Sequence, residues 1–152
     1  MSALVRLNLV PLTQSTREQA LEFVCREFVA GSVLHQSIGI KYAEYLEYMR
    51  KPFNAMADEK VSFVAIEKES DAIVGCLMAG DFALHTPELE SVPEFVRPVA
   101  ALLHDLEKPY RETRIPISGS TLLVDLAVVS NKVKGQGIYT RLRELALSLI
   151  HI

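Results

Sequence analysis

Residues 121–145 read TLLVDLAVVSNKVKGQGIYTRLREL, and this stretch decides the fold class. Residues 121–129 are nearly all apolar with one acid, Asp125, which is typical of a strand buried on both faces. A turn containing two glycines, Gly135 and Gly137, follows the strand and opens into a helix. The stretch therefore predicts a strand, a glycine-containing loop and a helix that starts at the loop.

The loop has the features of an anion-binding site. Glycines let the backbone approach a ligand, successive N–H groups point outwards, and the helix N-terminus adds about half a positive charge. Four basic side chains lie within twelve residues: Lys132, Lys134, Arg141 and Arg143. These features favour a phosphate or pyrophosphate ligand. The alternative is an ordinary strand-to-helix turn with a solvated basic face.

The N-terminal half predicts one strand and two helices. Residues 3–10 alternate apolar and polar side chains, which is the pattern of a strand. Ser15 and Glu18 have the spacing of a capping box, so we expect a helix to begin there. Apolar residues recur at helical spacing over 42–53, and Pro52 is expected to kink or interrupt this second helix.

The remaining segments complete a mixed α/β domain. Residues 61–67 and 72–82 predict two strands joined by a polar turn, the clearest hairpin in the sequence. Residues 99–106 predict a helix with one apolar face that ends before Pro109. The expected order is β-α-α-β-β-α-β-α, with helices flanking a central sheet.

Length and composition indicate a single globular domain. The chain has 152 residues, of which 49% are hydrophobic and 23% charged, so it is able to bury a core. The 16 basic and 19 acidic residues give a net charge of −3, which argues against a nucleic-acid partner. Cys25 and Cys76 lie far apart without metal-ligand spacing, which excludes a disulfide scaffold and a zinc cluster.

The same features indicate the compartment. Two unpaired cysteines fit a reducing environment. The N-terminus lacks the pattern of a signal peptide, and no run approaches the ~20 apolar residues of a membrane span. We therefore expect a cytoplasmic protein without a membrane partner.

The glycine loop resembles motif A of the GCN5-related N-acetyltransferase (GNAT) superfamily. That motif commonly reads Arg-Gly-x-Gly-Ile-Gly after a hydrophobic strand, and here it reads Lys134-Gly135-Gln136-Gly137-Ile138-Tyr139. The Rossmann pattern GxGxxG fails, because Thr140 stands where the third glycine belongs. Lys134 and Tyr139 depart from the usual motif, but neither removes the backbone amides that bind the ligand in the family.

The resemblance implies a fold, a co-substrate and a set of binding residues. The fold is the GNAT-type mixed central sheet flanked by helices. In that family the loop amides bind the pyrophosphate of acetyl-CoA, and the preceding strand offers backbone groups to its pantetheine arm. The expected cofactor-binding residues are Ala127, Val128, Val129, Lys134, Gly135, Gln136, Gly137, Ile138 and Tyr139. No metal is expected, because the thioester is already activated.

A second resemblance concerns the acceptor. Residues 28–40, FVAGSVLHQSIGI, and the following Tyr42-Ala43-Glu44-Tyr45 are similar to the arylalkylamine (dopamine and serotonin) N-acetyltransferase branch. This implies acetyl transfer from acetyl-CoA to the primary amine of a small molecule, an arylalkylamine in that branch. The alternative is a non-catalytic acyl-CoA-binding or interaction module that keeps the loop.

The resemblance does not assign a catalytic base in this sequence. The branch has a glutamate in a Glu-Pro-Leu stretch, which here reads Ser32-Val33-Leu34. Asp125 is the replacement candidate, since burial in an apolar strand would raise its pKa, and we expect it to share a face with residues 127 and 129. The competing interpretation is a structural carboxylate. His85 follows a strand and could face a cleft, although a loop histidine without a role is the favoured interpretation.

The resemblance also bears on domain organisation. We expect one GNAT domain over residues 1–152 that lacks the family's C-terminal strands and helix. Residues 147–152, LSLIHI, are similar to a translated sequencing adapter, and we hypothesise that this tail is an artefact.

Overall fold

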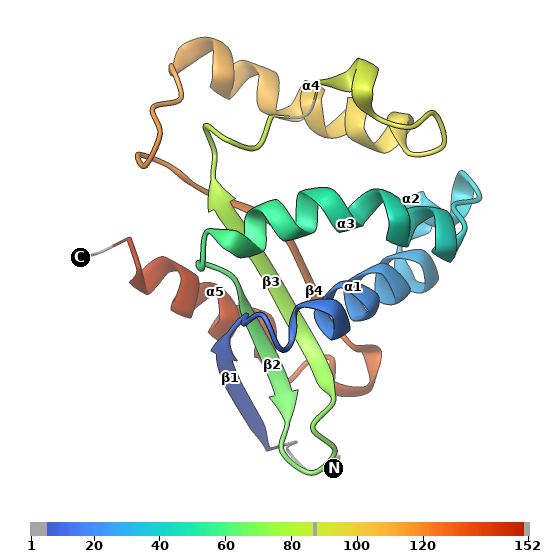
Figure 1. The fold of residues 1–152 in the computed structure, drawn as a ribbon, viewed down its shortest axis with the longest axis vertical. Coiled ribbons are helices and arrows are strands. Elements are labelled where there is room, and N and C mark those ends of the chain that lie inside the picture. Colours follow the sequence, from blue (N-terminus) through green and yellow to red (C-terminus); the bar gives the residue numbers. More distant parts are fainter. Residues whose placement is uncertain (1–5, 87, 151–152) are drawn as a thin grey trace.

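The computed structural model describes residues 6–86 and 88–150 (Figure 1). The strands are β1 (Leu7–Pro11), β2 (Phe63–Glu67), β3 (Ile73–Asp81) and β4 (Leu122–Val129). The helices are α1 (Arg17–Gly31), α2 (Val33–Ser37), α3 (Tyr42–Asp58), α4 (Arg97–Thr113) and α5 (Ile138–Ser148), with short 3-10 turns at Leu89–Ser91 and Asn131–Val133. The predicted order is confirmed, and the short helix α2 is added to it. The prediction for residues 3–5 and for the last two residues of the tail lies outside the described residues.

One antiparallel sheet forms the centre of the fold. Its strands lie in the order β1-β2-β3-β4, and every neighbouring pair is antiparallel. Helices α1 and α3 cover one face and α5 covers the other, while α4 lies beyond the end of the sheet (Figure 1). The apolar side chains of β3 alternate between the two faces, so each face has its own core.

The contact between α5 and the sheet depends on Gly75 in β3. A Cβ placed on Gly75 would lie 3.1 Å from a methyl of Ile138 and 3.2 Å from the Cβ of Ala65. These distances are tighter than ordinary van der Waals contact. The first turn of α5 therefore sits close to the strands, and this fixes the helix N-terminus beside the end of β4.

Two predictions about helix boundaries are wrong, and of the two outcomes predicted at Pro52 the interruption does not occur. Ser15 makes no capping box: its hydroxyl bonds the hydroxyl of Thr13, and α1 begins at Arg17. Pro52 does not interrupt α3, because buried side chains on both sides of it anchor the helix to the core. Pro109 does not end α4, which continues to Thr113.

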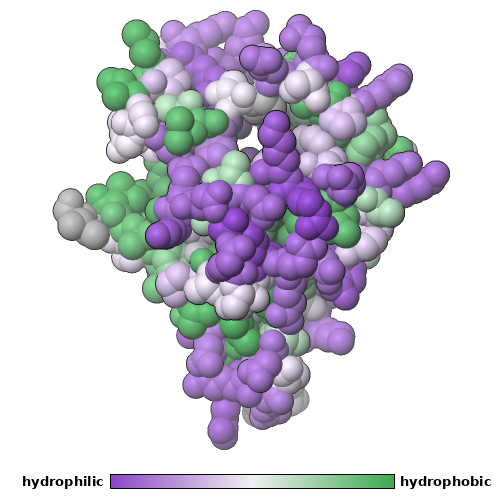
Figure 2. Space-filling view, in the orientation of Figure 1, coloured by the Kyte–Doolittle hydropathy of each residue, from purple (hydrophilic) through white to green (hydrophobic). Residues whose placement is uncertain are grey.

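The burial prediction for residues 121–129 is also wrong. Strand β4 is the last strand of the sheet among the described residues, and most of its side chains are half-buried. Strand β3 has the fully buried pattern instead. The apolar face predicted for α4 is likewise exposed at Leu102, Leu103 and Leu106. Hydrophobic residues also reach the surface in patches on the face shown in Figure 2.

Candidate functional site

The loop between β4 and α5 folds as a cradle around open space. Gly135 has a φ of +83° and Gly137 a φ of +70°, both in the left-handed region that favours glycine. Gly137 is the N-cap of α5, and a Cβ at either glycine would meet no atom within 4 Å. The backbone of this turn is therefore directed at a space that a ligand could enter.

A cavity of about 330 Å³ lies at this cradle. It is lined by Ala127, Val129, Asn131, Val133, Lys134, Gly135, Gly137, Ile138 and Tyr139. Seven of the nine predicted binding residues are among them. Val128 is not, because it packs with the core under α1 and α3 on the opposite face of the sheet, and Gln136 does not line the cavity either.

The electrostatics of the cradle favour an anion. No acidic residue lies in the first turn of α5, so nothing offsets the partial positive charge of the helix N-terminus. Lys134 lies at the rim, while the guanidinium of Arg143 lies 5.7 Å from the ring centre of Tyr139. The basic side chains and the helix N-terminus thus both favour an anion at the cradle.

Asp125 occupies a β-bulge in β4. Met78 pairs with Leu126 and Ala79 pairs with Val124, which leaves Asp125 as the extra residue between the two pairs. The expectation that Asp125 shares a face with residues 127 and 129 is therefore wrong. Those two residues pack under α5, whereas Asp125 lies on the side of α3 and α4.

The environment of Asp125 disfavours its charged form. Partial removal from water raises its pKa, and the nearby carboxylate of Glu107 on α4 raises it further, while His85 acts in the opposite direction. The residue nevertheless remains open to solvent. Asp125 is thus a solvent-reachable carboxylate whose pKa is shifted towards the range that a general base needs.

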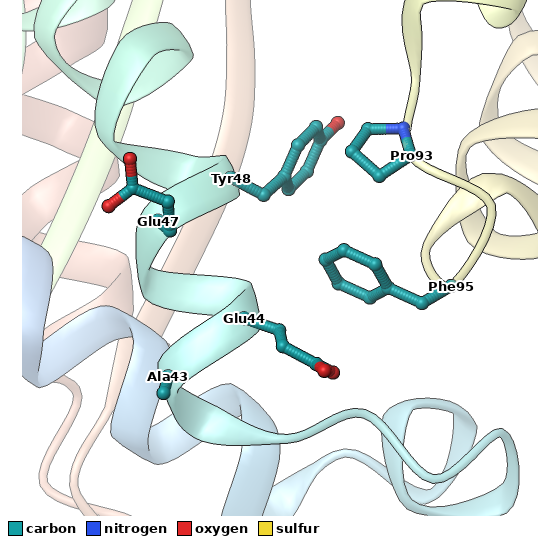
Figure 3. Close-up of a pocket in the computed structure, with 6 residues that line it drawn as sticks. All are labelled: Ala43, Glu44, Glu47, Tyr48, Pro93 and Phe95. Carbon is teal, nitrogen blue, oxygen red and sulfur yellow. The ribbon is translucent and has the colours of Figure 1, made fainter.

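A groove opens between α3 and the segment that precedes α4 (Figure 3). It has a volume of about 480 Å³ and is lined by Ala43, Glu44, Glu47, Tyr48, Pro93 and Phe95. The rings of Tyr48 and Phe95 meet edge to face, with centres 6.3 Å apart. Burial raises the pKa of Tyr48, and the charge of Asp125 raises it further, so this groove residue feels the charge of the aspartate. Glu44 extends towards the groove in Figure 3, whereas Glu47 is turned away from it.

The sequence did not predict that His85 is paired with Glu59. The Nε2 atom of His85 is hydrogen-bonded to Glu59 at the end of α3, and the other oxygen of Glu59 accepts a hydrogen bond of 2.6 Å from the backbone N–H of Asp81. Twenty-six positions separate His85 from Glu59, so no short sequence pattern predicts the pair. The one available signal was Gly80, a glycine inside a strand, which often marks a close approach.

Ser32, which the resemblance matches to the family's glutamate stretch, takes part in a different arrangement. The hydroxyl of Ser32 lies 2.8 Å from Nδ1 of His35, and the imidazole packs against the rings of Phe28 and Tyr45. Burial lowers the pKa of His35. These contacts hold α2 against the core, and they leave the imidazole buried rather than facing the groove.

Solved structures with this fold include amine-acylating proteins. The C-terminal condensation domain of Ebony, in complex with beta-alanyl-dopamine, matches with a TM-score of 0.71 and 19% identity over 97% of this chain and 67% of that chain. Arylalkylamine N-acetyltransferase 2 from Aedes aegypti matches with a TM-score of 0.68 and 14% identity over 96% of this chain and 71% of that chain. A putative arylalkylamine N-acetyltransferase 7 from the same mosquito gives 0.71 and 16% over 99% of this chain and 64% of that chain.

These matches establish the fold. No protein-family model matches the sequence, and no curated protein matches it. The chain has a GNAT-type fold in the form found in arylalkylamine N-acetyltransferases, and it spans about two thirds of the length of the matched structures. Among the described residues, no helix is long and apolar enough to cross a bilayer.

Proposed function

We propose that this protein is an acetyl-CoA-dependent N-acetyltransferase that acts on the primary amine of a small molecule. One observation carries the proposal: β4 has an anion cradle at its C-terminal end and, four residues before Val129, a solvent-reachable aspartate whose pKa is raised. The cradle suits the pyrophosphate of the co-substrate, and the aspartate suits an ammonium group. A single strand thus connects the two binding sites that the reaction needs.

The cavity residues would hold the co-substrate through the backbone. The N–H groups around Gly135 and Gly137 and the N-terminus of α5 favour a pyrophosphate there, and Lys134 adds a positive charge at the rim. Ala127 and Val129 line the same cavity, so the pantetheine arm would run along the half-buried end of β4. The remaining residues of the predicted set, Val128 and Gln136, would contribute main-chain atoms only.

The groove beside α3 would hold the amine. Tyr48 and Phe95 offer apolar and aromatic surface to the body of the molecule, and an aromatic face also attracts a cation. Glu44 and Asp125 supply negative charge for the ammonium group. This combination suits an arylalkylamine.

Asp125 would act as the general base. A primary amine attacks a thioester only after it has lost a proton, and a carboxylate with a raised pKa accepts that proton near neutral pH. The acetyl group then passes from sulfur to nitrogen without a metal. The free thiols of Cys25 and Cys76 are buried, and they support a reducing compartment such as the cytoplasm.

The alternative function is a non-catalytic acyl-CoA-binding or interaction module. It is favoured by the replacement of the family's glutamate with Ser32, whose hydroxyl is engaged with His35. A thiol-release assay with acetyl-CoA and dopamine, serotonin, tyramine or spermidine separates the two. The proposal predicts thiol release with at least one amine. Binding of acetyl-CoA without turnover on all four would establish the alternative.

A further inference from the structure

We propose that His85, held by Glu59 against Gly80, is a second proton acceptor of the amine site and takes the proton that Asp125 does not. The inference rests on the proposed function and deepens it, because it assigns a catalytic role to a residue outside the family motif. Three features of the molecule carry it: a seat for the pair, a fixed ring orientation, and a position next to Asp125.

The His85–Glu59 pair lies against the backbone of Gly80, which we call the seat of the pair. A Cβ on this residue would lie 2.8 Å from Nε2 of His85 and 2.8 Å from a carboxylate oxygen of Glu59. Real Cβ atoms essentially never approach other atoms so closely. The strand therefore needs glycine at this position for the imidazole and the carboxylate to lie on its surface.

The orientation of the ring is fixed from two sides. The carboxylate of Glu59 can only accept, so one oxygen takes a hydrogen bond from Nε2–H of His85 and the other takes one from the N–H of Asp81, which holds the carboxylate in place. Arg111 on α4 donates to the backbone carbonyl of His85 at 3.4 Å and stacks on the ring of Phe82. A carboxylate that binds one imidazole nitrogen leaves the other free as a base.

That second nitrogen is available. Within residues 6–86 and 88–150, Nδ1 of His85 has no hydrogen-bond partner, and it is not among the fully enclosed unpaired atoms. The side chain of His85 is 13% exposed, so a small ligand can reach it while bulk water is largely excluded. The pair thus has the arrangement of a carboxylate-supported general base.

His85 and Asp125 share one face of the sheet. Met78 and Cys76 of β3 belong to the core under α3, and the alternation of side chains puts the seat at Gly80 on the same side. Gly80 pairs with Leu123 of β4, and Asp125 lies two residues further along that strand. Such diagonal neighbours are about 7–8 Å apart at the backbone, within reach of a shared small molecule. The effect of His85 on the pKa of Asp125 agrees with this proximity.

The reaction removes two protons from the amine nitrogen, and two acceptors can each take one. An ammonium nitrogen carries three protons and the product amide nitrogen carries one, so two protons leave the nitrogen in each turnover. Asp125 takes the first, which frees the lone pair to form the C–N bond with the thioester carbon while the carbonyl pair moves to oxygen. His85 takes the second as the carbonyl reforms and the C–S bond breaks. The thiolate leaves with the bonding pair and receives this second proton, and Asp125 returns the first to solvent.

The test uses the variants H85A, G80A and G31A, with acetyl-CoA and the four amines named above as acceptors. We expect H85A to lower kcat about 100-fold with little change in KM, and added imidazole to restore about tenfold. G80A should also lower kcat, because its methyl displaces the pair without removing a charge. G31A is the matched control, since a Cβ at Gly31 meets no atom within 4 Å.

The outcomes separate this inference from the function on which it rests. Turnover by the wild type supports the acetyltransferase, and its absence on all four amines overturns that function together with this role. Given wild-type turnover, an H85A protein with unchanged kcat overturns the role of His85 alone. Loss of activity in H85A without imidazole rescue, accompanied by an earlier thermal transition, also overturns it.

Discussion

Burial raises the pKa of the Tyr48 phenol on α3, and the charge of the Asp125 carboxylate on β4 raises it further. Tyr48 also lines the groove, together with Phe95. This relationship couples a residue of the aromatic groove electrostatically to a carboxylate whose own pKa is raised. It underlies the assignment of the groove as the amine site.

Replacement of Asp125 with asparagine should separate catalysis from stability. The variant cannot accept a proton, so kcat/KM should fall by about 100-fold near neutral pH. The raised pKa means that the charged form is disfavoured in the folded state. Its contribution to stability is present at low pH and is lost as pH rises through the raised value. The asparagine variant should therefore have a higher free energy of unfolding than the wild type at pH 7, measured by urea denaturation.

The contrary outcome identifies a structural carboxylate. If Asp125 were a satisfied hydrogen-bonding group, the asparagine variant would unfold at lower urea and keep its turnover. Asp105 on the exposed side of α4 provides the control, because its side chain is 79% exposed and D105N should change neither quantity.

The pH dependence of kcat/KM should report the protonation of Asp125. Asp125 accepts a proton only when it is ionised, so kcat/KM should decline as pH falls through its raised pKa. This decline should start at a higher pH than an ordinary aspartate would give, and D125N should flatten it. A wild-type profile whose acidic limb persists unchanged in D125N would assign the limb to another group.

The groove should determine affinity for the amine. Phe95→Ala removes one of two facing rings and should raise KM for dopamine and tyramine about tenfold, with a smaller effect on spermidine. Steady-state kinetics over the three amines measure this. Leu106→Ala is the control, since Leu106 is 69% exposed on α4 and outside the groove. Equal KM values in wild type and F95A for every amine would remove the groove from the acceptor site.

The close contact between α5 and the sheet should contribute to the free energy of unfolding. Gly75→Ala forces a methyl against Ile138 and Ala65, and such overpacking costs about 1–3 kcal/mol. We expect a lower urea midpoint for G75A and an unchanged one for G31A. An unaltered midpoint in G75A would mean that α5 is held by other contacts.

Local patterns predicted the strand–loop–helix unit, and long-range contacts decided the rest. Gly135 and Gly137 predicted the cradle because the loop needs left-handed backbone within a few residues of sequence. The bulge at Asp125 could not be predicted, since it is a property of the register with β3. The pairing of His85 with Glu59 brings together two segments that share no sequence pattern. Helix α3 continues through Pro52 because tertiary packing outweighs the one hydrogen bond that the proline removes.

The most direct test of the account is calorimetric binding of coenzyme A to the loop, because both the acetyltransferase and the alternative module require it. We compare wild type with Gly137→Val, Gly119→Val and Lys134→Ala. Gly119 also has a positive φ and open space around it, so G119V introduces the same backbone strain away from the cradle.

We predict that wild type, G119V and K134A bind coenzyme A, with a loss of at most about 1 kcal/mol for the exposed lysine. Gly137→Val should abolish binding, because its side chain fills the space that the pyrophosphate would take. Binding of coenzyme A to G137V as tightly as to the wild type would contradict the account.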